Sequence, residues 1–205
     1  MAQTQKHGPP ASTRNAILDA AEKIFIERGF SDTSMSKIAK AARVTKSLIH
    51  HHFGSKEQLW AEIKKRRFHE YFSVQKEQLA AADAGIESFK TCIINLFNVL
   101  RDDPEVVRLI SWHLLDRAQT ERHEDEKELT AMGHAKLLEG QELGYLRNDI
   151  DTRYMLISFF CLVFHWFMSK HEYLKWVGIE PDSITADDEY LENMLKIFFQ
   201  GVLPR

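Results

Sequence analysis

Residues 35–53 read MSKIAKAARVTKSLIHHHF, and this stretch predicts two short helices joined by a tight bend. Ile38, Ala39 and Ala42 give the first helix one apolar or small face, and Val44 is placed to fill the bend. A pair of short helices with a small residue at the crossing is the pattern of a helix-turn-helix, whose second helix lies in the major groove of DNA.

The second helix of the pair is predicted to begin near Lys46. Thr45 can cap it through its hydroxyl, while Leu48 or Ile49 together with Phe53 supplies its buried side. The remaining side chains must then face outward, toward base edges and backbone phosphates. These outward residues are Lys46, Ser47, His50 and His51.

The flanking sequence makes the pattern more specific. A preceding helix is predicted from Thr13 to Arg28, with apolar residues at helical spacing and Gly29 at its end, and GSKEQLW follows the motif. From Thr13 to Leu59 the chain resembles the N-terminal domain of the tetracycline-repressor (TetR) family of transcription regulators. The resemblance implies an all-α protein of about nine helices, in which a helix-turn-helix domain precedes a helical ligand-binding and dimerisation domain.

The resemblance and the outward positions together define the expected DNA contacts. They are Thr33, Ser34, Arg43, Thr45, Lys46, Ser47, His50, His51 and Lys56. Helix capping alone would also account for Thr33 and Ser34, and Lys56 could be a solvated lysine. Arg43 departs from the family, which has glycine in the bend, where a positive φ is common. Either the bend is adjusted, or Arg43 offsets the strain with a phosphate contact.

Charge is divided unevenly along the 205 residues. Residues 1–56 hold nine Lys/Arg and four Asp/Glu, a net charge of +5, whereas residues 57–205 hold 18 and 26, a net charge of −8. A basic head on an acidic body suits a protein that binds phosphate through the head alone. The expected organisation is a disordered arm over 1–12, a DNA-binding domain over 13–56 and an effector-binding and dimerisation domain over 57–205.

The N-terminal residues have no apolar run and do not resemble a signal peptide. Cys92 and Cys161 lie far apart in apolar surroundings, so we expect reduced, buried thiols in a cytoplasmic protein.

The body is expected to be helical throughout. A fourth helix should run from Ser55 to about Ala82, with a Ser55/Gln58 capping box and a solvated KKRR run at 64–67. In the family this helix transmits ligand binding to the DNA-reading helices. The further helices are predicted over 86–101, 104–119, 121–143, 153–176 and 188–200.

The segment YMLISFFCLVFHWFM, residues 154–168, is apolar on nearly every face. It is shorter than the roughly 20 apolar residues that cross a bilayer, so we expect protein on both of its sides. With the stripe Leu191, Met194, Leu195, Phe198 and Val202 of the last helix, it resembles the family's four-helix dimer interface. A core within one chain is the alternative.

The resemblance also implies a ligand cavity among the middle helices. The candidates for its lining are Phe68, Phe72, Phe89, Ile93, Phe97, Trp112, His113, Leu138, Phe160, Phe164 and His165. This mix suits an apolar or aromatic effector, with His113 or His165 as a polar anchor. The same aromatic spacing would equally suit a plain core, in which case the protein would act without an effector.

The sequence lacks the short motifs typical of several enzyme classes. It contains no HExxH, GxSxG or glycine-rich phosphate loop. Adjacent histidines on a helix point about 100° apart, so His50 to His52 cannot converge on one metal ion. We therefore expect no catalytic residue, metal or cofactor, and keep a helical metal-dependent hydrolase as the alternative. The favoured function is a dimeric regulator, most simply a repressor, that binds a near-palindromic operator and is released by a small molecule.

Overall fold

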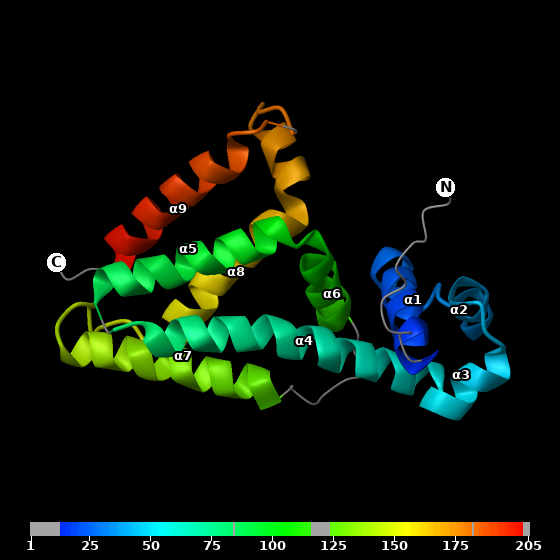
Figure 1. Ribbon diagram of the computed structural model, residues 1–205. Helices are drawn as coiled ribbons and strands as arrows, with labels where there is room; N and C mark the ends of the chain where they lie inside the picture. The colour runs from blue at the N-terminus through cyan, green and yellow to red at the C-terminus, as the bar shows by residue number, and fades with distance from the viewer. Residues whose placement is uncertain (1–12, 84, 116–123, 182, 203–205) are drawn as a thin grey trace, which may run out of the picture. The chain divides into compact units, whose positions relative to one another are not determined.

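The computed structural model describes residues 13–83, 85–115, 124–181 and 183–202, and all regular structure in these ranges is helical (Figure 1). This confirms the expected fold class. The helices are α1 (Thr13–Arg28), α2 (Met35–Ala42), α3 (Lys46–Phe53), α4 (Lys56–Ala81), α5 (Ile86–Asp102), α6 (Pro104–Leu115), α7 (Glu124–Glu142), α8 (Thr152–Trp176) and α9 (Ala186–Val202). The expected arm over residues 1–12 and the expected extension of α6 to Gln119 lie outside the described residues.

The chain divides into two compact units, Met1–Arg67 and Phe68–Arg205, and the division falls inside α4. We expected the boundary at the beginning of this helix. The first turns of α4 belong to the first unit because Leu59, Trp60 and Ile63 are buried there.

The core of the first unit follows the predicted spacing of α1. Ile17, Ala21 and Phe25 are fully buried, and Ile38 of α2 and Ile49 of α3 join them. Each of the three small helices therefore contributes its apolar face to one core, which fixes the outer faces of α2 and α3.

Of the KKRR run at 64–67 only Lys65 is exposed, so the run is not, as a whole, the solvated face that we expected. Lys64 is buried, and its ammonium lies 5.3 Å from the centre of the Trp60 ring. Arg66 donates a 2.9 Å hydrogen bond to Asp19 of α1. The expectation was wrong because acidic residues of α1 face this side of α4 and pair with its cations.

In the second unit α8 packs against α5, α6, α7 and α9. Met155, Val163 and Phe164 form part of its buried face. Its opposite face is exposed along a line that we call the α8 stripe: Tyr154, Ile157, Cys161, His165 and Met168. Cys161 was expected to be buried, and its exposure follows from its place on this stripe.

The apolar residues of α9 lie differently from our expectation. Met194, Leu195 and Phe198 are buried within their own chain, and the Phe198 ring lies 6.1 Å from that of Phe89 on α5. Leu191 of the same stripe is half-buried. Met194, Leu195 and Phe198 therefore belong to an intrachain core. They are covered because α9 packs on α5 and α8.

One helix in the described part of the chain, α8, is long and apolar enough to cross a membrane by length and composition alone. Its buried face nevertheless carries polar links to α9. Trp166 and Lys170 both bond to the carboxylate of Asp187, each at 2.8 Å. Such links are typical of a helix packed within a protein.

Helices α4 and α7 lie side by side and run in the same direction (Figure 1). Lys76 of α4 binds Asp125 near the beginning of α7, and Lys136, farther along α7, donates to the Ala82 carbonyl just after α4, at 2.8 and 2.7 Å. His69 also contacts Asp125 at 3.0 Å. This pair of helices forms one wall of the second unit.

Candidate nucleic-acid interface

The N-terminus of α2 is closed by a side-chain cap. Ser34 has extended backbone dihedrals, and its hydroxyl accepts a 3.3 Å hydrogen bond from the Lys37 amide. The side chain of Ser34 is used as predicted for a cap, and the residue remains exposed. It is thus placed where a phosphate could approach the positive end of α2.

Thr33, unlike the exposed Ser34, is buried. It is only 2% exposed, and its hydroxyl donates a 2.7 Å hydrogen bond to the Gly29 carbonyl at the end of α1. Its side chain cannot reach a phosphate from this position. We therefore correct the expectation for Thr33, whose side chain ties the loop before α2 to α1.

The bend between α2 and α3 keeps its usual geometry although Arg43 replaces glycine there. Arg43 has φ 56° and ψ 40°, the left-handed conformation, and is the only non-glycine residue with positive φ in the described part of the chain. The Arg43 amide donates to Lys40, and the Val44 amide donates to Ala39. These two hydrogen bonds form a Schellman ending, so the bend keeps its usual geometry and the arginine bears the strain.

Helix α3 is capped by Thr45, whose hydroxyl accepts a 3.2 Å hydrogen bond from the Leu48 amide. Ile49 and Phe53 are buried, as predicted. Lys46, Ser47, His50 and His51 are all exposed. The helix therefore presents one outer face of lysine, serine and histidine side chains.

His50 is held in one orientation by the residue that ends α3. Its Nδ1 lies 2.6 Å from the carbonyl oxygen of Gly54. A carbonyl only accepts, so Nδ1 must carry the proton and the neutral ring leaves Nε2 as an acceptor. Only the protonated ring can donate a second hydrogen bond, for example to a phosphate oxygen.

Two features fix the junction of α3 and α4. Gly54 has φ 72°, and a Cβ at this position would lie 2.0 Å from the Gln58 side chain, so the turn requires glycine. The Ser55 hydroxyl accepts from the Gln58 amide, and the Gln58 side chain accepts from the Ser55 amide, at 3.2 and 3.0 Å. This confirms the predicted capping box.

Lys56 is neither solvated nor free to bind a phosphate with its whole ammonium group. Its Nζ donates to the carbonyls of Phe30 and Thr33 at 2.9 and 3.0 Å and lies 4.0 Å from the centre of the Phe30 ring. Two of its three N–H donors are therefore engaged. Lys56 ties α4 to the loop between α1 and α2 and so positions the reading helices.

The cations of α2, the bend and α3 differ in their pairing from those of α1 and the first part of α4. Lys40, Arg43 and Lys46 are exposed and form no ion pair with any described residue. By contrast, Arg14 pairs with Glu62. Lys40 was not among the predicted contacts, although its place on α2 opposite the buried Ile38 could have indicated it. Unpaired cations beside the outer face of α3 form a surface suited to an anionic backbone.

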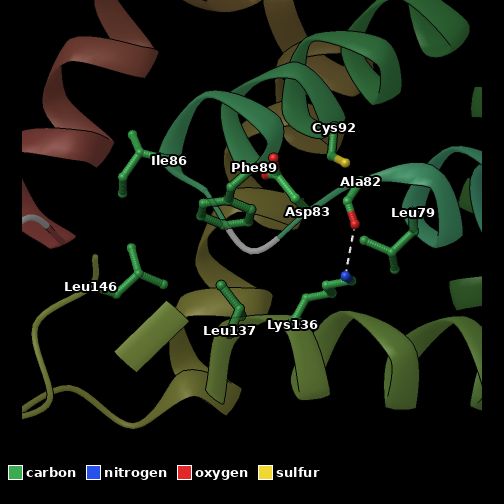
Figure 2. A pocket seen from close by; sticks show the side chains of 9 residues that line it. All are labelled: Leu79, Ala82, Asp83, Ile86, Phe89, Cys92, Lys136, Leu137 and Leu146. Carbon is green, nitrogen blue, oxygen red and sulfur yellow. Dashed lines mark hydrogen bonds between the residues drawn. The ribbon is translucent and has the colours of Figure 1, made fainter. Parts of the chain in front are cut away.

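A cavity lies at the end of α4 in the second unit, and it has room for about one water molecule (≈ 20 Å³) (Figure 2). Its lining comes from α4, α5, α7 and the segments that follow α4 and α7: Leu79, Ala82, Asp83, Ile86, Phe89, Cys92, Lys136, Leu137 and Leu146. Of the eleven residues expected to line a ligand cavity, only Phe89 is among them.

The other expected lining residues lie in the core or on the surface. Ile93 and Phe97 are fully enclosed by side chains, and Phe160 stacks on Phe164 at 5.4 Å. The remaining aromatic residues gather elsewhere, with the Phe68 ring 5.1 Å from His113. Phe72 and Trp112 are half-buried, and neither residue lines the cavity.

Leu138 and His165 correct the expectation most directly, because both are exposed. Leu137 is buried and lines the cavity, whereas Leu138, about 100° farther around α7, faces away from it. His165 lies on the α8 stripe and cannot anchor a ligand in an enclosed cavity.

Comparisons with known proteins agree with this geometry. The family model for bacterial regulatory proteins of the tetR family matches residues 17–63, and the model for the tetracyclin repressor-like C-terminal domain matches residues 93–183. Together they cover the reading helices and most of the second unit.

Individual relatives match over different lengths. The HTH-type transcriptional regulator AcrR of Shigella flexneri is 49% identical over 51 residues, which are 25% of this chain and 24% of AcrR. The HTH-type transcriptional repressor NicS of Pseudomonas putida is 22% identical over 210 residues, which cover 98% of this chain and 99% of NicS.

The fold matches solved structures as well. The crystal structure of AibR in complex with isovaleryl coenzyme A and operator DNA superposes with a TM-score of 0.67 and 21% identity, covering 92% of this chain and 98% of AibR. A helix-turn-helix unit with exposed, unpaired cations, the two family matches and this shared fold lead to one conclusion. The chain belongs to the TetR family of transcriptional regulators.

Proposed function

We propose that this protein is a homodimeric repressor that occupies a near-palindromic operator in the cytoplasm and leaves it when a small molecule binds the second unit. The observation that carries the proposal is the row of exposed, unpaired cations, Lys40, Arg43 and Lys46, beside the outer face of α3. The protein would act as a binding protein and not as an enzyme.

The DNA contacts divide by role. Lys46, Ser47, His50 and His51 would reach base edges and phosphates in the major groove from α3. Arg43 would contact a phosphate from the bend. Ser34 and Thr45 keep their capping bonds and would offer the amide groups of their helix N-termini to phosphates. Thr33 and Lys56 are left with structural roles.

The α8 stripe supports the dimer. Tyr154 is 67% exposed and Ile157 55% exposed, on a helix whose opposite face packs in its own unit. A second copy of the chain placed against the same stripe would cover both sets of side chains, as an isologous interface requires. Two α3 helices held about 34–36 Å apart would then meet successive major grooves.

An effector is supported by the position of the cavity on α4. This single helix carries Leu59 and Trp60 in the core of the first unit and Leu79 on the wall of the cavity. A ligand that moves the end of α4 would therefore act on the helix that also supports the reader. AibR binds isovaleryl coenzyme A and operator DNA, and we carry over only the coupling of a small molecule to DNA binding. The small size of the cavity favours, as a second candidate, a repressor that acts without an effector.

The proposal is tested by selecting bound duplexes from a random pool and measuring affinity for the selected site at several salt concentrations. Lys46→Ala should weaken binding and reduce the slope of log affinity against log salt by about one, because one phosphate contact is lost. Lys65→Ala removes the same charge from an exposed position on α4 and serves as the control. A pool that yields no preferred duplex, or equal slopes for both variants, would contradict the proposal.

A further inference from the structure

The buried stripe of α4 in the second unit contains an amide among apolar side chains. Phe68 and Tyr71 are buried at one end of the stripe, and Leu79 and Ala82 line the cavity at the other. Between them stands Gln75, which is only 8% exposed. The spacing of these residues by three or four places puts them on one face of the helix.

Gln75 and its neighbour Gln78 hold unused hydrogen-bonding groups. The Nε2 of Gln75 and the Oε1 of Gln78 are both enclosed, and neither has a hydrogen-bond partner among the residues that the structure describes. Buried amide groups in proteins are nearly always paired. The two atoms together offer one donor and one acceptor on the side of α4 that leads to the cavity.

The cavity supplies an apolar continuation of this site. From Gln75 to Ala81, the last residue of α4, the helix advances about 9 Å at 1.5 Å per residue. Beyond it lies the cavity, and Figure 2 shows Leu137, Leu146 and Phe89 among the side chains that line it. A molecule lying along α4 would therefore place a polar group at the glutamines and an apolar group among these side chains.

The charges at the cavity are already engaged. The Lys136 ammonium donates 2.7 Å to the Ala82 carbonyl, and the Asp83 carboxylate accepts 2.8 Å from the Gly85 amide. A hydrogen bond from Ser88 is the main cause that lowers the pKa of Asp83, and Lys136 contributes to the same direction. Lys136 also pairs with Glu139 at 3.7 Å. The lysine is therefore offset by two carboxylates, and no uncompensated positive charge remains to attract an anionic ligand.

The thiol in the lining is neutral as well. Burial raises the pKa of Cys92, so its thiol stays protonated at neutral pH. The path from the glutamines to the cavity is therefore lined by neutral groups, apart from the compensated charges at its mouth.

We propose that Gln75, Gln78 and the cavity form one elongated effector site for an uncharged, mainly apolar molecule with a carboxamide-like group. The ligand carbonyl accepts from Gln75, its N–H donates to Gln78, and its chain enters the cavity between α4, α5 and α7. This inference rests on the proposed function, in which the second unit takes a small effector. Because the cavity holds only about one water molecule, a ligand of this length must displace the end of α4 from α7.

The test uses hexanamide, octanamide and decanamide against the carboxylates of the same chain lengths, with binding to the whole protein measured by calorimetry. At least one amide should bind, and its carboxylate should bind at least about tenfold more weakly. Gln75→Leu should weaken amide binding by about tenfold, the loss of one hydrogen bond.

A second measurement reports on Gln75 without any ligand. Gln75→Leu should keep or raise the melting temperature, because it removes a buried amide that lacks a partner. Gln141 is the matched control, since its amide donates to the carbonyls of Arg147 and Ile150, both at 2.8 Å. Gln141→Leu should lower the melting temperature.

Several results would overturn the inference. They are the absence of binding by all three amides, equal binding of amide and carboxylate, equal binding to wild type and Gln75→Leu, or a Gln75→Leu melting temperature as low as that of Gln141→Leu. Operator binding is measured separately on ligand-free protein. Its absence would contradict the repressor function, while the calorimetry would still decide the ligand site.

Discussion

At the scale of single residues, Arg43 is expected to have opposite effects on stability and on DNA binding. Its left-handed backbone costs an L-amino acid on the order of 1 kcal/mol, which glycine would avoid. Glycine also gains entropy in the unfolded chain, so the two effects partly cancel. We predict that Arg43→Gly changes the free energy of unfolding by no more than about 1 kcal/mol in the stabilising direction, while operator affinity falls.

Urea unfolding and operator binding at several salt concentrations measure these two quantities. Arg43→Lys keeps the charge and the strain, so it should resemble the wild type in both. A Gly variant that unfolds more easily than the wild type would show that the Arg43 side chain stabilises the bend.

His50 is the second residue whose contribution can be isolated. Its Nδ1 is committed to Gly54, so only the protonated ring can donate to a phosphate. We predict that His50→Tyr, whose hydroxyl can donate to a phosphate, binds the operator at least as tightly as the wild type, whereas His50→Phe, which cannot donate, binds it more weakly. Fluorescence anisotropy at constant ionic strength measures the three affinities, and equal affinity of all three proteins would refute the role.

The residue scale also shows where prediction from sequence stops. Ser34, Thr45 and Ile49 could be assigned because a cap or a buried position depends on neighbours three or four residues away. Lys56 could not, because its partners are carbonyls 26 and 23 residues earlier in the chain. A lysine gives no sequence signal for which distant carbonyl it will reach.

At the scale of elements, the pairing of α4 with α7 should depend on pH. The hydrogen bond from Lys76, with a smaller contribution from His69, lowers the pKa of Asp125 to about 2. The folded pKa lies below the ordinary value of about 3.9, so this stabilisation is fully present above about pH 4 and is lost as pH falls toward 2. We predict that Asp125→Asn lowers the free energy of unfolding by roughly 0.5–1 kcal/mol at neutral pH.

The difference between Asp125→Asn and the wild type should shrink as the pH of the unfolding experiment is lowered from about 4 to about 2. Glu124→Gln is the control, because Glu124 is largely exposed and pairs with Lys127 in its own helix. A constant difference across the acid range would mean that Asp125 acts through packing and not through its charge.

Helices were easier to predict than the spaces between them. The ends of α1, α4 and α7 follow from local signals, among them Gly29, the Ser55/Gln58 capping box and Gly144, whose φ is 75°. The cavity lining depends on how side chains from three helices fill a shared volume. Periodicity places an aromatic residue on an inner face but does not tell a filled core from a cavity, which is why Phe97 was included and Leu137 was missed.

At the scale of the whole molecule, the proposed dimer rests on an apolar surface that the chain does not cover itself. Met194, Leu195 and Phe198, which we first assigned to the interface, are buried in the chain, so we assign the interface to the α8 stripe. Trp166 and Tyr190 stack at 3.9 Å, and the Tyr190 hydroxyl donates to the Leu162 carbonyl at 2.8 Å. These contacts tie α8 to α9, so the two helices would enter the interface as one element.

A charge on the α8 stripe should therefore separate the protomers without unfolding them. Ile157 and Met168 are 55% and 42% exposed, so glutamate at both positions meets water in the monomer but would be desolvated opposite its own copy in the dimer. We predict that light scattering on the double variant Ile157→Glu/Met168→Glu gives the monomer mass of 23.9 kDa, where the wild type gives about twice that value. Operator affinity should fall by at least about a hundredfold, because each monomer then binds one half-site alone. Val74→Glu, on an exposed position of α4, should leave the mass unchanged. If the double variant stays dimeric, the two copies meet through another surface, and the α8 stripe needs a different occupant.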